Sequence, residues 1–357
     1  MKPHFRVALT LILIAAVIGG AFLLGKRIIY PPTLRMLAEQ HDLSIGVAVS
    51  GWGLNDPAYA GLILRQFNQI TPENAMKFGP LCPERGIYRF AEADRIVSFA
   101  IINDLRVRGH TLVWTNQLPA WLTEEPLTRQ EYMDILREHI TTVVGRYRGH
   151  IYAWDVVNEA VANDGSLATA DNFWMQAIGP DYLEMAFRWA HEADPEALLF
   201  YNDAFAEGAG AKSEGVYELV RSLQEKGVPI HGVGLEMHIG VSWYNPNPNE
   251  VANNIQRLAN LGLQIHITEM DVRLPPPVTS DLLDQQAALY ADMLEVCLAA
   301  PNCTSFAMWG LTDAHSWIPP TFPGWAAPLV FDDAYQPKPA YQALIDTLTD
   351  FTRPAAP

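Results

Sequence analysis

The chain has 357 residues, a formal net charge of −16 and a hydrophobic content of 49%. The apolar content excludes a disordered chain, and an acidic surface would repel a phosphate backbone, so we expect no nucleic-acid partner. A neutral polymer remains compatible with this charge.

The N-terminus predicts a membrane-targeting segment. A short basic start precedes an uncharged, mostly apolar run over residues 7–24, and a basic pair follows it. Eighteen such residues are about the minimum that spans a bilayer. We therefore assign residues 1–30 to a signal anchor or a cleaved signal peptide, and the lack of a convincing small-x-small site favours the anchor. Any membrane contact is expected only through this segment.

Short apolar runs then alternate with helical patterns over residues 33–353. The clearest helix is 281–299, whose apolar positions follow the helical period, with Ser280 as its N-cap. The strand candidates are Ser44–Ser50, Gln69–Thr71, Arg106–Trp114, Tyr152–Asn158, Leu198–Asn202, Gly232–Glu236, Gln264–Thr268 and Ser305–Trp309. Eight such units predict an α/β fold, a (β/α)8 TIM barrel in a single domain.

Cofactor and metal motifs are absent from the sequence. No glycine-rich phosphate-binding motif follows an early strand, and no HxH, HExxH or CxxC spacing occurs. We therefore predict no cofactor and no metal.

Polar residues gather where the predicted strands end, which is the face of such a barrel that carries the chemistry. The residues at these ends are Glu73-Asn74, Trp114, Asn158-Glu159, Asn202-Asp203, Glu236 with His238, Glu269 with Asp271, and Trp309. A barrel without a site has no need for so many polar groups there.

Two glutamates at these ends predict glycoside hydrolysis. Glu159 ends the fourth strand and Glu269 the seventh, and these strands face one another across the barrel mouth. Hydrolysis of a glycosidic bond uses two carboxyl groups, one to protonate the leaving oxygen and one to attack or to activate water. An isolated glutamate would be read as a solvated or ion-paired residue, but two on one rim favour catalysis. Their separation, which distinguishes retention from inversion, is not given by the sequence.

Several segments together carry a family resemblance. They are Thr71–Lys77, Gly109–Trp114, Trp154–Glu159, Tyr201–Asp203, Gly232–Leu235 with His238, Ile267–Glu269, and Trp309–Asp313 with Ser316-Trp317. Because these segments occur together in this order, the chain resembles glycoside hydrolase family 10, the barrel endo-β-1,4-xylanases, from about residue 43 to 344. The resemblance implies that residues 33–353 are a catalytic barrel acting on xylan or xylo-oligosaccharides.

The resemblance also implies roles for individual residues. Glu159 would be the acid/base and Glu269 the nucleophile, with net retention, and His238 and Asp271 would orient and charge-stabilise Glu269. Asn158 would donate to a sugar 2-hydroxyl. The remaining substrate-binding candidates are Glu73, Asn74, Lys77, His110, Trp114, Gln117, Glu236, His238, Trp309 and Trp317. Bulky Trp317 and Gln117 would exclude the exocyclic CH2OH of glucose and so select xylose, with moderate discrimination.

Two positions depart from the family pattern. Thr115 stands where the family most often has His, and Glu236 where Gln is usual. An additional carboxyl group beside Glu269 would repel its charge and raise a pKa in the site. We therefore hypothesise that Glu236→Gln shifts the acidic limb of the pH–rate profile.

Alternatives remain open at this stage. Cys297 and Cys303 form either a disulfide or two buried thiols, and Cys82 is left over. The chain could instead be a related barrel glycosidase on β-glucan or mannan, a non-catalytic carbohydrate-binding protein or a metal-dependent hydrolase. Because xylan lies outside the cell, we expect an extracytoplasmic location, membrane-anchored or secreted, and a monomer.

Overall fold

The computed structural model describes residues 31–124, 126–168 and 170–352. The predicted signal segment, residues 1–30, therefore lies outside the described residues. Residues from Thr33 onward form one compact unit. Within the described part of the chain, no helix combines the length and apolar character needed to cross a membrane.

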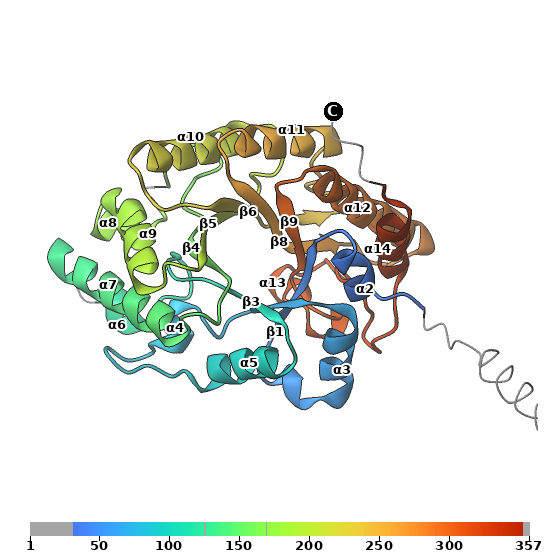
Figure 1. The fold of residues 1–357 in the computed structure, drawn as a ribbon, viewed down its shortest axis with the longest axis horizontal. Coiled ribbons are helices and arrows are strands. Elements are labelled where there is room, and N and C mark those ends of the chain that lie inside the picture. Colours follow the sequence, from blue (N-terminus) through green and yellow to red (C-terminus); the bar gives the residue numbers. More distant parts are fainter. Residues whose placement is uncertain (1–30, 125, 169, 353–357) are drawn as a thin grey trace, which may run out of the picture. The chain divides into compact units, whose positions relative to one another are not determined.

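Parallel strands close into a barrel, which confirms the predicted TIM fold (Figure 1). The barrel strands are β1 (Ser44–Val49), β2 (Gln69–Pro72), β3 (Arg106–Gly109), β4 (Ala153–Asn158), β5 (Leu198–Asp203), β6 (Gly232–Leu235), β8 (Gln264–Arg273) and β9 (Cys303–Met308). Each pairs with its neighbour in the sheet, and the pairing of β6 with β8 completes the ring. Every residue of β1, β2, β4 and β6 is buried, as expected for parallel strands covered on both faces.

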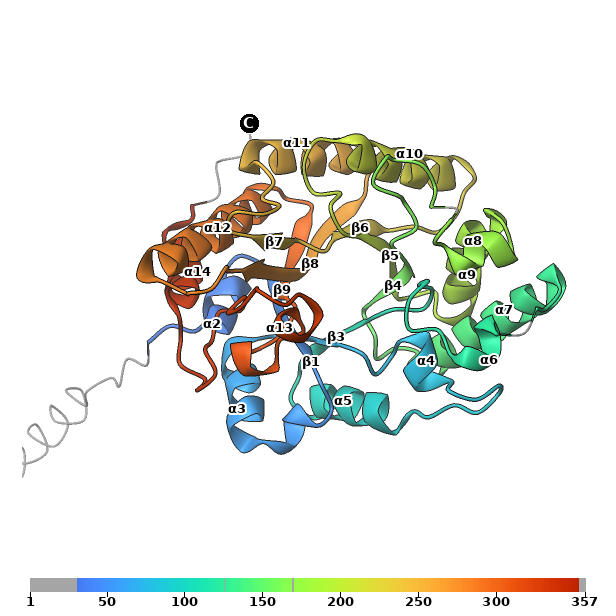
Figure 2. The same cartoon turned by 180° about the vertical axis from the view of Figure 1, so that it is seen from behind.

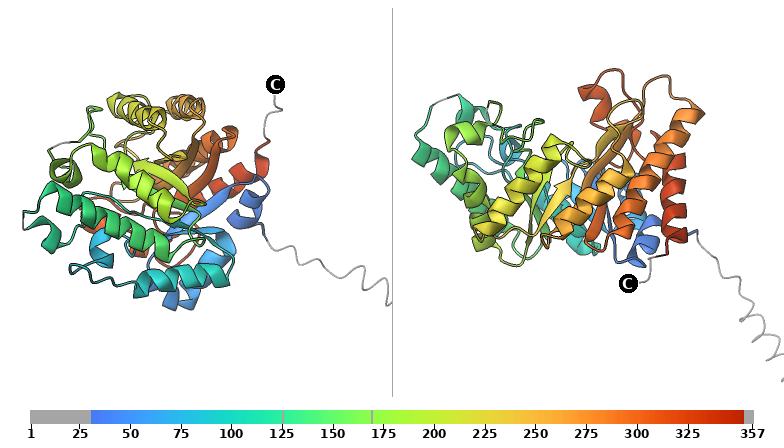
Figure 3. Two further views of the ribbon diagram at one scale, coloured as in Figure 1. Left: turned by 60° about the vertical axis from the view of Figure 1, so that its left-hand side comes forward. Right: turned by 90° about the horizontal axis from the view of Figure 1, so that it is seen from above.

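Helices surround the strands, as the view from behind and the side views show (Figures 2 and 3). The longer ones are α2 (Leu34–Glu39), α3 (Pro57–Gln66), α5 (Ala91–Ile102), α7 (Arg129–Arg146), α9 (Asp181–Ala193), α10 (Ala211–Glu225), α11 (Pro248–Ala259), α12 (Ser280–Ala299) and α14 (Pro339–Asp350). The shorter ones are α4 (Phe78–Leu81), α6 (Ala120–Thr123), α8 (Phe173–Ala177) and α13 (Ile318–Thr321).

Local sequence explains where two of these helices begin. The Thr128 hydroxyl accepts from the Glu131 N–H and the Glu131 carboxylate accepts from the Thr128 N–H, which is a capping box at the start of α7. Helix α12 is capped by Thr279, whose hydroxyl accepts from the Leu282 N–H. The prediction of Ser280 as this N-cap is therefore wrong by one residue, because Ser280 already has helical geometry.

Most predicted strand bounds lie within two residues of the observed ones, but two strand ends differ by five residues. Strand β3 ends at Gly109 rather than Trp114, although Val113 still forms a bridge to Val157. Strand β8 does not stop at Thr268 but continues to Arg273. It continues because a further short strand, β7 (His238–Gly240), pairs with its second half. Glu269 therefore lies inside a strand and not at its end.

A single glycine lets the barrel core close at β3. A Cβ atom on Gly109 would lie 2.2 Å from the ring of Trp154, which is fully buried on the neighbouring strand β4. Since no real Cβ approaches a ring so closely, only glycine fits here. The position directly precedes His110, so this packing also fixes where that side chain enters the site.

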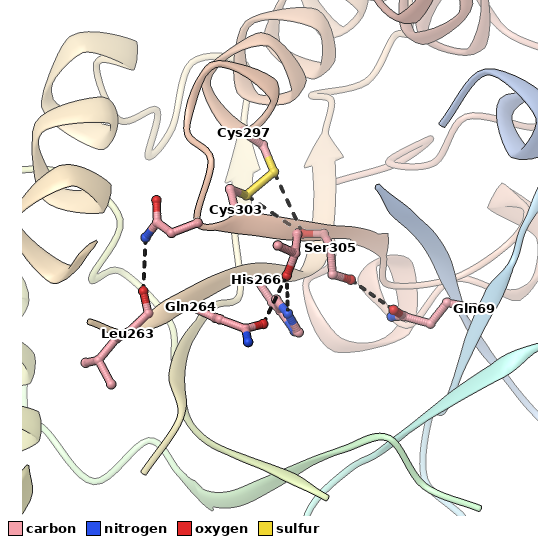
Figure 4. The surroundings of a disulfide bond; sticks show 9 residues. Gln69, Leu263, Gln264, His266, Cys297, Cys303 and Ser305 are labelled. Carbon is pink, nitrogen blue, oxygen red and sulfur yellow. Dashed lines mark hydrogen bonds between the residues drawn. A yellow bond between two sulfur atoms is a disulfide. The ribbon is translucent and has the colours of Figure 1, made fainter. Parts of the chain in front are cut away.

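The cysteine alternative is decided in favour of a disulfide (Figure 4). Cys297, near the end of α12, is bonded to Cys303 at the start of β9, and their Cα atoms lie 5.2 Å apart. Cys82 is free and buried. The bond joins the last turn of α12 to the start of β9. It therefore lies at the opposite end of the barrel from the polar carboxyl ends of the strands.

Candidate active site

A cleft of about 690 Å³ opens at the carboxyl ends of the strands. Every residue predicted to be catalytic or to bind substrate lines this cleft. They come from the loops after β2, β3, β4, β6 and β9, from the end of β4, and from β7 and β8. Asp271 lies behind them, fully buried. The barrel topology therefore brings together side chains that are almost 250 residues apart in sequence.

Glu159 is presented by a left-handed turn. Its φ of 53° is uncommon for a residue with a Cβ and costs of order 1–3 kcal/mol. Hydrogen bonds hold the turn: the Glu159 N–H donates to the Asn202 carbonyl at 3.0 Å, and the N–H groups of Ala160 and Val161 donate to the Tyr201 hydroxyl at 3.0 and 3.1 Å. Strand β5 thus fixes the direction in which Glu159 points.

Glu269 is held by an amide of fixed orientation. The Thr268 hydroxyl donates to Asn202 Oδ1 at 2.7 Å, so the NH2 group of Asn202 must face the other way. There it donates to Glu269 Oε1 at 2.7 Å and to Asn158 Oδ1 at 2.8 Å. The carboxylate is therefore fixed in place from one side.

His238 approaches Glu269 from the opposite direction. Its Nδ1 lies 2.9 Å from Asp271 Oδ2, and its Nε2 lies 3.5 Å from Glu269 Oε2. Trp317 Nε1 donates to the same Asp271 oxygen at 2.8 Å. Burial disfavours the imidazolium, but the charge of Asp271 outweighs burial and raises the pKa of His238 to about 10. His238 is thus a cation beside Glu269 at neutral pH.

A second histidine completes the surroundings of Glu269. His110 Nδ1 lies 3.0 Å from Asp155 Oδ2 and 3.6 Å from Glu269 Oε1. Asp155 also accepts from Nε and Nη2 of the buried Arg108 guanidinium. Burial opposes ionisation of Asp155, yet Arg108 and His110 hold its pKa below the usual range.

The two central glutamates differ in pKa. Burial raises the pKa of Glu159, and the negative charge of Glu269 adds to this. Glu269 is more deeply buried than Glu159, but its charge interaction with His110 and its hydrogen bond and charge interaction with His238 outweigh burial and lower its pKa. One carboxyl group is therefore set to carry a proton while its neighbour is ionised, the division that acid and nucleophile require.

Glu236 shares the same partners. Its Oε1 lies 3.2 Å from Asn202 Nδ2 and its Oε2 lies 3.7 Å from His238 Nε2. Burial, together with the charges of Glu269 and Glu159, raises the pKa of Glu236 well above its usual range. Glu236 is therefore neutral under conditions where Glu269 is ionised.

Thr115, the other departure from the family pattern, faces away from the cleft. Its hydroxyl donates to the carbonyl of Asp171 at 3.0 Å and accepts from the Phe173 N–H at 2.9 Å. It therefore supports the loop that precedes α8.

Away from the glutamates, polar groups after β2 and β3 meet at one oxygen. Asn74 Oδ1 accepts from Lys77 Nζ at 2.9 Å and from Gln117 Nε2 at 3.3 Å. The Lys77 ammonium also lies 4.9 Å from the centre of the Trp114 ring. Fixed donors beside an aromatic wall suit the hydroxyl groups and apolar face of a sugar ring.

Some cleft residues were missed by the sequence analysis. Lys212, Trp243 and Arg273 line the cleft but were not considered, and Asn202, which is fully buried and bonds to Glu269, was noted at a strand end but given no role. Arg273 follows Glu269 and Asp271 at alternate positions of one strand, a period that identifies residues on the same face. Lys212 lies in the first turn of α10 and bonds to Asp203 at 2.8 Å, and nothing local in the sequence indicates this pair.

Two groups of side chains have ligand atoms close enough to hold a metal ion. They are His110, Asp155 and Glu269, and Glu236, His238 and Glu269, each within 4.8 Å. In both groups the histidine bonds through Nδ1 to a carboxylate. The absence of a metal stays a prediction.

Comparison with known proteins agrees with this geometry. Residues 33–347 match the model of glycosyl hydrolase family 10. The chain is 44% identical to endo-1,4-beta-xylanase B of Thermotoga neapolitana over 89% of this chain and 92% of that protein. It is 40% identical to exoglucanase XynX of Acetivibrio thermocellus over 85% of this chain but only 28% of that protein. The crystal structure of xylanase 10B from Thermotoga petrophila in complex with xylobiose superposes with a TM-score of 0.87 at 42% identity, covering 90% of this chain and 98% of that one.

Proposed function

This chain belongs to glycoside hydrolase family 10, and from that premise we propose that it is an endo-1,4-β-xylanase that cleaves internal xylosidic bonds with retention. The observation that supports this most directly is the opposite shift in pKa of Glu159 and Glu269 within one cleft. Such a pair matches the two protonation states needed at the start of the reaction.

The proposed reaction has two steps. Glu269 attacks the anomeric carbon while Glu159 gives its proton to the leaving oxygen, so the glycosidic bond breaks and a glycosyl ester forms on Glu269. Glu159, now ionised, removes a proton from water, and the resulting hydroxide displaces Glu269. Both carboxyl groups return to their initial states. No cofactor enters this scheme.

The surrounding residues take positioning roles in this scheme. Asn202 and His238 keep Glu269 ionised and aimed at one point, and Asp271 acts on it through His238. Asn158, whose side-chain oxygen is held by Asn202, directs its NH2 group into the cleft for the sugar 2-hydroxyl. Such contacts strengthen as the transition state forms.

Selectivity for xylose is proposed to be steric. Trp317 is fixed by its bond to Asp271, and Gln117 by its bond to Asn74, so neither side chain can easily move aside for a CH2OH group. The name of the Acetivibrio relative favours keeping β-glucan as a second candidate substrate. A clash of this kind gives only moderate discrimination.

We also propose that the enzyme is a monomer outside the cytoplasm, attached through residues 1–30 or released after their removal. The Cys297–Cys303 disulfide supports this location, because such bonds persist in oxidising compartments. Fractionation of cells, followed by protease treatment of intact cells, tests it; a chain that is protected until lysis would contradict the proposal.

The decisive experiment measures sugar release from xylan, cellulose and mannan. We expect xylan-selective release of short oligosaccharides, and its loss by at least about a thousandfold in Glu269→Ala. Glu250→Ala, which removes an exposed carboxylate on α11, is the matched control and should remain active. Release mainly from cellulose would keep the mechanism and overturn the substrate. No release by the folded protein would overturn the proposed function.

A further inference from the structure

Arg273 is a cleft cation with no anionic partner. It lies at the end of β8, lines the cleft and is only 2% exposed. Its Nε is buried without a hydrogen-bond acceptor, and no hydrogen bond or ion pair among the described residues involves its guanidinium. The two lysines of the cleft differ, since Lys77 donates to Asn74 and Lys212 is paired with Asp203.

The surrounding chain fixes the plane of this guanidinium. Its centre lies 4.2 Å from the ring of Trp243 and 4.2 Å from the ring of Phe322. Gly240 on β7 pairs with Arg273, and a Cβ there would lie 2.6 Å from Arg273 Cγ, so this glycine leaves room for the side chain. Two aromatic rings thus pack beside the guanidinium, and its N–H groups are left to bind an acceptor.

The charges nearby do not satisfy this cation. Asp271 is the nearest acidic residue on the strand and acts on Arg273 through its charge, but neither of its oxygens bonds to the guanidinium. Its Oδ2 accepts from His238 and Trp317, and its buried Oδ1 has no hydrogen-bond partner among the described residues. Burying a guanidinium without an acceptor is costly. The equally buried Arg108 differs, because its Nε and Nη2 both bond to Asp155. The missing acceptor is therefore expected from the ligand.

The N–H groups of the Arg273 guanidinium determine which kind of ligand can bind. A planar guanidinium with free N–H groups binds a carboxylate through two parallel hydrogen bonds. The xylan main chain has no charge, so a carboxylate must come from a uronic acid attached to it. The ring of Trp243, 42% exposed at the rim, offers a face on which a branch sugar can stack.

We propose that Arg273 binds the carboxylate of uronic acid branches on xylan, so that the enzyme prefers acid-branched over neutral-branched chains. This inference rests on the proposed xylanase function. Arg273 lies four residues beyond Glu269 on the same strand face, or about 13 Å along it, so the branch belongs to a xylose away from the cleaved bond. In an acidic protein of charge −16, a local cation is also what overcomes general repulsion of the branch.

The test compares two forms of one polymer. In the carboxyl-reduced form of glucuronic-acid-branched xylan, a neutral CH2OH group replaces the carboxylate of each branch. The ratio of kcat/KM on the acidic polymer to kcat/KM on the reduced polymer therefore isolates the effect of the carboxylate. We expect a ratio well above one for the wild type and a fall of about tenfold or more in Arg273→Gln. Arg273→Lys keeps the charge without the two-pronged geometry and should retain part of the preference.

Arg257→Gln is the matched control. Arg257 also lies over an aromatic ring, at 4.8 Å from Tyr217, but it bonds to Glu214 and Asn254 outside the cleft. The Arg257→Gln substitution removes the same net charge as Arg273→Gln and should leave the ratio of kcat/KM unchanged. An equal fall of the ratio in Arg257→Gln would assign the preference to net charge and overturn the proposal.

Other outcomes are equally informative. A wild-type ratio near one, or an unchanged ratio in a folded Arg273→Gln protein, overturns the branch site while cleavage of linear xylan leaves the proposed function standing. If Arg273→Gln does not fold, a ratio in Arg273→Lys equal to that of the wild type overturns the proposal, and a lower one supports it. Failure to cleave linear xylan at all would instead remove the proposed function.

Discussion

His238 Nδ1 lies 2.9 Å from Asp271 Oδ2, and this contact keeps a positive charge next to Glu269. Without Asp271, only the hydrogen bond and charge of Glu269 would oppose burial, so the pKa of His238 would fall. The ionisation of Glu269 thus depends on a carboxylate that lines no part of the cleft. Asp271 is a positioning residue whose role can be measured through pH.

Asp271→Asn should move the acidic limb of the kcat/KM profile to higher pH by about one unit. In the wild type the raised pKa of His238 supplies positive charge up to about pH 10, which favours ionised Glu269. In the variant that charge is lost at lower pH, so the pKa of Glu269 rises. Asp313→Asn, which breaks the buried 2.9 Å pair with Lys338, is the control. If the acidic limb moved equally in Asp271→Asn and Asp313→Asn, the specific role of Asp271 would be contradicted.

Glu236→Gln should extend activity at alkaline pH rather than shift the acidic limb. The sequence suggested an effect at acidic pH, but the structure shows that burial, Glu269 and Glu159 raise the pKa of Glu236, so it is already neutral there. As pH rises, ionisation of Glu236 places a third negative charge beside Glu159 and Glu269. Glutamine cannot ionise, so the alkaline limb should move up. An unchanged alkaline limb would show that Glu236 does not limit activity.

The pH dependence of the free energy of unfolding gives an independent measure of the protonation of Glu236. The folded state keeps Glu236 protonated above its ordinary pKa of 4.5, whereas the unfolded chain loses that proton. The free energy of unfolding should therefore fall as pH rises from about 4.5 towards the raised value, and it should fall less in Glu236→Gln. Urea unfolding at several pH values measures this difference, and parallel curves for the two proteins would argue against it.

Replacing both Cys297 and Cys303 by serine should lower the free energy of unfolding by about 2 kcal/mol, the chain-entropy value for a loop of this length. Reductant should destabilise the wild type to a similar extent and leave the double variant unaffected. Cys82→Ala is the control, since Cys82 is free and the variant should still respond to reductant. A response lost in Cys82→Ala would point to different thiol chemistry.

Chelation should leave activity intact. His238, with a pKa of about 10, is protonated at neutral pH and has no free lone pair for a metal. The Glu236–His238–Glu269 group is thus better suited to hydrogen bonding than to metal binding. Assays after dialysis against EDTA, with and without added Zn²⁺ or Ca²⁺, check this. Loss of activity that the metal restores would revive the metal-dependent hydrolase.

The sequence by itself determined the barrel and most of its site. Alternating strands and helices have few arrangements that bury their apolar faces, and a closed parallel barrel puts all carboxyl strand ends on one rim. For that reason Glu159 and Glu269, more than 100 residues apart, could be assigned to one cleft from their positions alone.

Tertiary structure alone decided what depends on distances between elements. Whether Cys297 and Cys303 bond, whether β8 continues past Glu269, and which carboxyl group is ionised all follow from partners elsewhere in the chain. Arg273 is the sharpest example, because its lack of an acceptor becomes visible only once Trp243 and Phe322 are in place. Periodicity records which face a residue occupies, but pKa and pairing depend on the charges that folding brings within a few ångströms.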